Sequence, residues 1–170
     1  PMRNAQVVAN SVEDPLMNTV DSKSQASAAW MEHQILDHVK QALRVTLNWK
    51  VPAVGMPRKL NTLQFTMKSF QRHLQRIMDL EEQDGYMAQV AESKPNLFDR
   101  IQQLQRDHVE FRNLLKALGP EVDSLSEFEN DRFEVVCGEI SELLDKVDRH
   151  DADEVELLQE TMLYDEGGEG

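Results

Sequence analysis

Apolar side chains recur between residues 63 and 81 at intervals that alternate between four and three positions. The stripe runs from Leu63 through Phe70 to Ile77, and its next position is occupied by Glu81. This spacing places the side chains along one face of an α-helix, and such a face must be buried against another element. The chain is therefore predicted to fold by packing helices together, with a carboxylate at the end of one buried face.

Three further stretches show helical spacing, separated by segments rich in Gly, Pro and polar residues. The first helix is expected to start near Ser24 or Ser27 and to run to about residue 49. The others are expected from Asn61 to residue 83, from Asn96 to Gly119-Pro120, and from a capping box at 124–127 to about residue 163. A bend is expected near 149–152, and residues 86–93 are expected to add a short helix. The predicted fold class is all-α, an up-and-down antiparallel four-helix bundle.

The predicted organisation is a single bundle with two ends of different composition. Residues 1–23 lack a sustained period and are interpreted as a flexible N-terminal arm. Residues 24–164 form the bundle, and residues 165–170 form an acidic, Gly-rich tail.

Charge and composition exclude several classes of function. The chain has 18 Lys and Arg against 31 Asp and Glu, a formal net charge of −13. This balance argues against binding to nucleic acid and against a helix held on an anionic membrane surface. No apolar run approaches the roughly 18 residues that suggest a membrane span. Cys137 is the single cysteine, so no internal disulfide can form, and we expect a reducing compartment, the cytoplasm.

Every predicted long helix carries a metal-ligand type of side chain at or beside its apolar stripe. These side chains are His33, Glu81, His108 and the pair His150 and Glu154, which are one helical turn apart. An isolated carboxylate in a bundle core would cost several kcal/mol or take up a proton. A cation between these groups removes that cost, and imidazole with carboxylate suits Fe, Mn or Zn better than Ca or Mg.

Each of these residues also has an explanation without a metal. His33 is then a hydrogen-bonded core histidine, and Glu81 is a carboxylate at a frayed helix end. His108 is a polar residue that sets the register of the stripe, and His150 with Glu154 marks a solvated bend. The four explanations are independent, whereas one cation accounts for all four helices together.

These residues resemble the hemerythrin-like (HHE cation-binding) domain family over about residues 26–164. The resemblance rests on four patterns in order along the chain: Glu32-His33, Leu80-Glu81-Glu82 followed by Gly85-Tyr86, Asp107-His108 followed by Phe111, and His150-Asp151-Ala152-Asp153-Glu154. It implies Glu81 as a carboxylate that bridges two metal ions. The family's second helix usually carries a histidine one turn before this Glu, and here Ile77 stands in its place. His73, one turn earlier, is a further candidate ligand at the margin of the stripe, and Glu82 is expected to point to solvent or to the surroundings of the ligands.

The resemblance implies non-haem iron, one or two ions, with Mn or Zn as substitutes. It implies a bundle that binds or senses oxygen, a related small molecule, iron or redox state. We expect a binder rather than a turnover enzyme, since no nucleophile–base set, phosphate loop or dinucleotide motif is present. Two alternatives stay open. One is a metal-free regulatory or interaction module with an unidentified protein partner, and the other is a di-iron oxidase or peroxidase.

Overall fold

The computed structural model describes residues 15–83 and 86–166, and every regular element in these ranges is a helix. Four helices are long, and α3 and two single 3₁₀ turns lie between them. The elements are α1 (Pro15–Asn48), η1 (Ala53–Gly55), α2 (Met56–Gln83), α3 (Tyr86–Ser93), η2 (Pro95–Leu97), α4 (Phe98–Asp123) and α5 (Asn130–Glu166).

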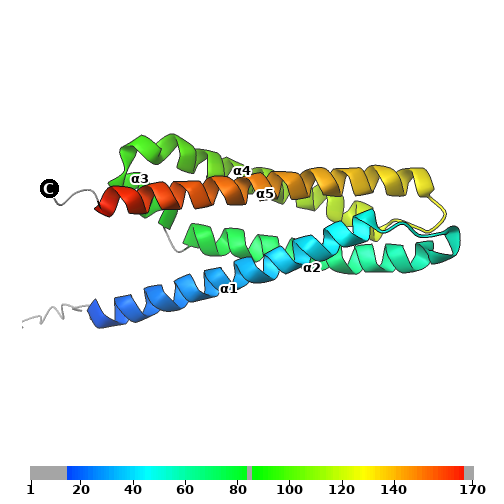
Figure 1. The fold of residues 1–170 in the computed structure, drawn as a ribbon, viewed down its shortest axis with the longest axis horizontal. Helices are drawn as coiled ribbons and strands as arrows, with labels where there is room; N and C mark the ends of the chain where they lie inside the picture. The colour runs from blue at the N-terminus through cyan, green and yellow to red at the C-terminus, as the bar shows by residue number, and fades with distance from the viewer. Residues whose placement is uncertain (1–14, 84–85, 167–170) are drawn as a thin grey trace, which may run out of the picture.

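The four long helices run alternately up and down along one axis, which confirms the predicted all-helical four-helix fold (Figure 1). Helix α1 packs mainly against α2, and α4 packs against both α2 and α5. The contact between α1 and α5 is much thinner. Short α3 lies at the end of the bundle where α2 finishes and α4 begins (Figure 1).

The apolar interior is divided into two clusters. The larger one fills most of the bundle and includes the predicted stripe of α2, with Leu63, Phe70 and Ile77 each at most 2% exposed. The smaller one lies at the α3 end and consists of Met87, Val90, Leu97, Ile101, Leu104 and Leu157. None of the described helices contains an apolar stretch long enough to cross a membrane.

Two helices begin earlier than the sequence predicts. Helix α1 starts at Pro15, so residues 15–23, expected as part of a flexible arm, are helical. Proline is favoured at the first helical position, where its missing N–H costs no hydrogen bond. Helix α2 starts at Met56 with Pro57 in its first turn, so Asn61 lies inside the helix rather than at its cap. The arm's residues 1–14, and residues 167–170 of the predicted tail, lie outside the described residues.

The later helix boundaries also differ from expectation. Helix α4 starts after Leu97 and continues through Pro120 to Asp123 instead of ending at Gly119-Pro120. The residue before a proline clashes through its Cβ in a helix, and Gly119 has no Cβ. Ser124 does not cap a helix with Glu127 as predicted: its hydroxyl donates to the backbone oxygen of Glu121, and α5 begins only at Asn130, after a turn in which Glu129 accepts hydrogen bonds from the backbone N–H and the hydroxyl of Ser126. Helix α5 is continuous through 149–152, where a bend was expected, and extends to residue 166.

Candidate metal centre

Five side chains from the four long helices meet near the end of α2. His33 comes from α1, Glu81 from α2, His108 from α4, and both His150 and Glu154 from α5. They form two overlapping groups that share Glu81. The first contains Glu81, His108 and His150, and the second contains His33, Glu81 and Glu154; in each, one ligand-type atom per residue lies within 4.8 Å of the others.

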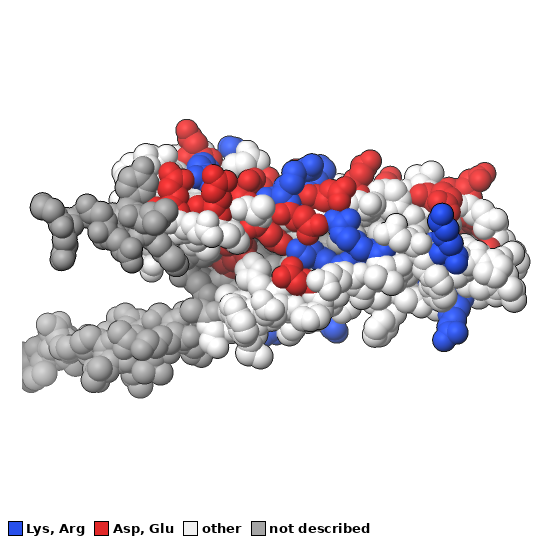
Figure 2. Space-filling view, viewed as in Figure 1, with Lys and Arg blue, Asp and Glu red and all other residues white. Residues whose placement is uncertain are grey.

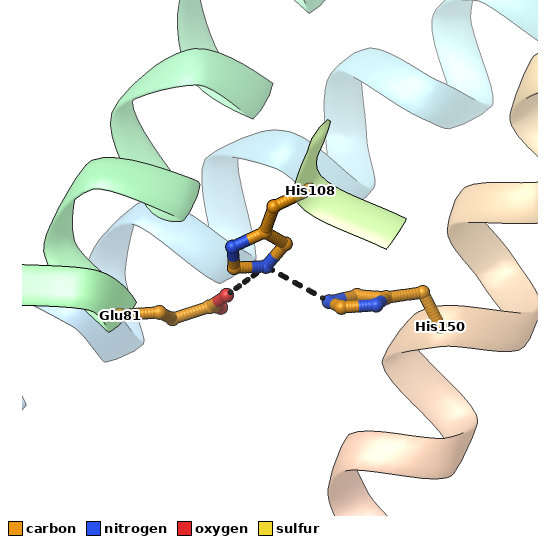
Figure 3. Close-up of side chains that lie close together, drawn as sticks. All are labelled: Glu81, His108 and His150. Atoms are coloured by element: carbon orange, nitrogen blue, oxygen red, sulfur yellow. Dashed lines mark hydrogen bonds and ion pairs between the residues drawn. The ribbon is translucent and has the colours of Figure 1, made fainter. Parts of the chain in front are cut away.

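The first group is closed off from solvent. His108 is fully buried, and Glu81 and His150 are each 4% exposed. Nε2 of His108 lies 3.0 Å from Oε2 of Glu81 and 3.2 Å from Nε2 of His150. Figure 3 shows the three side chains pointing toward one another from α2, α4 and α5. Phe111 also packs against His150, and the two rings are nearly perpendicular with centroids 5.4 Å apart.

A carboxylate fixes the orientation of each imidazole in the first group. Nδ1 of His108 lies 2.9 Å from Oε1 of Glu82, and Nδ1 of His150 lies 3.1 Å from Oδ2 of Asp107. Arg112 donates to both oxygens of Glu82, at 2.8 and 3.0 Å, and so holds that carboxylate in place. An ionised carboxylate can only accept, so Nδ1 of each histidine carries the hydrogen and donates it. When such a ring is neutral, its Nε2 carries a lone pair.

Three electron-pair donors consequently converge on one buried point. They are Nε2 of His108, Nε2 of His150 and the carboxylate of Glu81. Although Oε2 of Glu81 is close to His108, it accepts no properly aligned hydrogen bond from any described residue. A buried acceptor without a donor costs about 1–3 kcal/mol, more when it is charged. Such a point is stabilised by a positive charge, which is supplied by a bound cation or a shared proton.

The second group is more open and has one imidazole. Nε2 of His33 lies 3.0 Å from Oε1 of Glu81, and the His33 side chain is 33% exposed. Glu154 is buried at 4% exposure. Ile77, one turn before Glu81 on the same face of α2, is 2% exposed and offers no ligand atom.

Mutual contacts shift the pKa of three of these groups. Burial alone would raise the pKa of Glu81, but His108 and His33 outweigh it and lower the pKa to about 2. Burial would likewise lower the pKa of His33, yet Glu81 and the charges of Glu154 and Asp151 raise it. The pKa of His108 is also raised, by Glu81 and Glu82 acting against burial. The centre is therefore built around a carboxylate that is ionised at neutral pH.

The remaining candidate ligand, His73, belongs to neither group. Its Nδ1 contacts Oε1 of Glu32, a buried carboxylate that also lies 3.1 Å from Nε of Arg76. Sequence reasoning missed Glu32 as its partner, and missed Asp107 as the partner of His150. Asp107 directly precedes His108 and so lies off the apolar stripe, where an acidic residue looks like part of the solvated face.

Comparisons with protein-family models, curated proteins and solved structures give no match to this chain. The resemblance to the hemerythrin-like family therefore rests on the residues themselves. The fold and the centre define a class: an all-helical bundle whose interior contains a His/Glu cluster suited to a metal ion.

Proposed function

We propose that this protein is a non-haem metal-binding bundle that holds one cation between Glu81, His108 and His150. A second cation position, between His33, Glu81 and Glu154, lies beside the first. The observation that carries the proposal is the convergence of two imidazole nitrogens and a carboxylate, without an aligned donor for Oε2 of Glu81. The hydrogen bonds from Nδ1 to Glu82 and Asp107 support it, because histidines that bind metals usually donate their other N–H to a carboxylate.

The donor set favours iron. Two histidines with one carboxylate and further open positions are typical of non-haem Fe(II) sites, and imidazole also suits Zn, while carboxylate suits Mn. Calcium and magnesium prefer all-oxygen surroundings. When bound, the iron would supply a redox-active centre. The protein's part is to hold three ligands in a water-poor interior and to leave the side of His33, whose side chain is a third exposed, accessible.

The function that follows is binding or sensing rather than turnover. The second position is more exposed and has fewer imidazoles, so its cation exchanges with solution more readily than the buried one. The occupancy of this position would therefore depend on the concentration of iron in solution. The pair of ions would respond to oxygen, a related small molecule or redox state. A metal-free regulatory module is the alternative that one observation favours, because the raised pKa of His108 allows a proton to take the place of the cation.

Metal content per chain tests the proposal. Metal-free full-length protein is incubated with Fe²⁺ without oxygen, desalted and subjected to elemental analysis, with Mn²⁺ and Zn²⁺ in parallel. We expect about one tightly held ion per chain, with the second lost more easily on desalting. His108→Leu should abolish retention, and His38→Ala, which removes an exposed histidine bonded to the backbone of α1, should not. A wild-type chain that retains no metal would establish the metal-free module instead.

A further inference from the structure

Where α1 meets α5, the two helices are joined by pairs of oppositely charged or ligand-type side chains in one antiparallel register. Arg44 faces Asp145, Lys40 faces Asp148, and His33 faces Glu154. As the residue number rises on α1, it falls by nearly the same amount on α5. Figure 2 shows acidic and basic side chains side by side along this face of the molecule. The pairs Arg44–Asp145 and Lys40–Asp148 form a row between α1 and α5, here called the ladder. The second metal position, between His33 and Glu154, lies at the next place in this row.

Lys40 is the best anchored member of this ladder. Its side chain is buried, and Nζ lies 3.0 Å from Asp37, 3.0 Å from Asp148 and 2.5 Å from Asp151. Arg44, one turn further along, lies 3.0 Å from Asp145 and 2.5 Å from Asp148. Both Lys40 and Arg44 therefore contact Asp148, and Lys40 also contacts Asp151, the neighbour of His150.

The ladder has a mechanical consequence because α1 has little other contact with α5. Helix α1 is held chiefly by α2, while α5 is held chiefly by α4. His33 is the one ligand of the centre that α1 contributes, and Glu154 is contributed by α5. The separation of these two ligands depends on how α1 is set along α5. Ligand positions must be held to about 0.5 Å for a productive geometry.

We propose that Lys40 and Arg44 are positioning residues for the second metal position, which hold α1 in register with α5 so that His33 faces Glu154. The inference rests on the proposed function. The first position does not depend on the ladder, since Glu81, His108 and His150 all come from α2, α4 and α5. The ladder therefore affects the geometry of the second cation position and leaves that of the first unchanged.

Charge alone predicts the opposite effect of removing Lys40. A neutral residue at this position removes a positive charge near the second cation and leaves three aspartates less compensated, which would strengthen cation binding. Positioning predicts weaker binding at the second position. The sign of the change therefore distinguishes the two accounts.

The experiment is a stepwise titration of metal-free, full-length protein with Co²⁺, whose visible absorption reports its coordination. The variants are Lys40→Met, Lys40→Arg and Asp148→Asn. The last of these removes the carboxylate that Lys40 and Arg44 both contact. Lys68→Met is the matched control, because it removes the same charge from an exposed pair with Asp123. We expect Lys40→Met and Asp148→Asn to lower the affinity for the second equivalent of Co²⁺ about tenfold, which is the scale for groups that orient ligands. The affinity for the first equivalent should stay unchanged. Lys40→Arg should retain most of the second equivalent, and Lys68→Met should match wild type.

Each other outcome overturns the inference in a recognisable way. A second equivalent that binds unchanged or more tightly in Lys40→Met would show that the ladder does not position His33, even if Asp148→Asn binds it more weakly, because charge alone also predicts weaker binding in Asp148→Asn. Equal weakening of both equivalents would show a general loss of structure, which circular dichroism of the same samples would reveal. A wild-type protein that binds no Co²⁺ would refute the proposed function itself, and with it the premise of this inference.

Discussion

The two cation positions share Glu81 and differ in almost everything else. The first has two imidazoles, both buried and both held by a carboxylate at Nδ1. The second has one imidazole, a third exposed, and its partner carboxylate is the shared Glu81 itself. Ligand type already differs, with two imidazoles in the first position and one in the second. Burial and the support of each ligand separate them, and we expect a tight first position beside a weak, exchangeable second one.

The largest expected effect comes from Glu81→Gln, because this change removes the carboxylate that both positions need. The amide keeps the size of the side chain but loses its charge, so both cations lose their central anion. We expect iron retained after desalting to fall from about one ion per chain to nearly none, by elemental analysis. Glu134→Gln, an exposed change of the same kind on α5, should leave retention unaltered. Retention by the Glu81 variant would place the metal elsewhere.

The next prediction separates the two positions. His150→Ala should abolish the tight equivalent, because it removes one of two buried imidazoles from the first group. His33→Ala should leave the tight equivalent in place and abolish the weak one. Co²⁺ titration with visible absorption measures both equivalents in each variant. A loss of the tight equivalent on His33→Ala would mean that the ranking of the two positions is reversed.

A smaller effect is expected from the carboxylate behind His150. Asp107→Asn removes the negative charge from Nδ1 of this imidazole and makes Nε2 a weaker donor to a cation. We expect about 10- to 100-fold weaker binding at the first position, measured by competition with a chelator. Asp153→Asn, which removes an exposed acid nearby on α5, is the control. Equal effects of the two changes would indicate a general charge effect rather than support of the ligand.

The last prediction is a pH dependence of opposite sign in metal-free and metal-loaded protein. In the metal-free protein the pKa values of His33 and His108 are raised. Their protonated forms stabilise the fold below the unfolded pKa, and this contribution is lost as pH rises through the folded pKa. A cation needs neutral imidazoles, so the stabilisation it adds should grow with pH, by up to about 1.4 kcal/mol per pH unit for each proton displaced. Thermal unfolding between about pH 6 and pH 8, with and without metal, measures this difference, and a constant difference would contradict proton displacement.

The sequence was informative where a residue type conflicted with its position. Glu81, His108 and His150 were found because each interrupts an apolar stripe at helical spacing, and the structure brings all three together. The stripe on α2 was also correctly predicted as buried, including Ile77 at the place where the resemblance implies a histidine.

Residues off the stripes could not be predicted in this way. Asp107 occupies a position that resembles a solvated face, and its contact with imidazole depends on how neighbouring helices are rotated. For Glu82 the sequence left solvent and the surroundings of the ligands open, and the structure has it against His108. The starts of two helices were also predicted too late in the sequence. The expected starts, near Ser24 or Ser27 and at Asn61, left Pro15 and Pro57 outside the helices, although a proline in the first turn is compatible with a helix.

X-ray absorption at the metal edge, on protein loaded with one Fe²⁺ per chain, tests the central claim most directly. Scattering from the outer carbon and nitrogen atoms of a bound ring shows whether the ion is bound by imidazole. The account predicts two imidazoles per iron in wild type and one in His150→Ala loaded at higher metal concentration. A wild-type spectrum without imidazole ring scattering would contradict it, because the ion would then be held by carboxylates and water rather than by the buried centre.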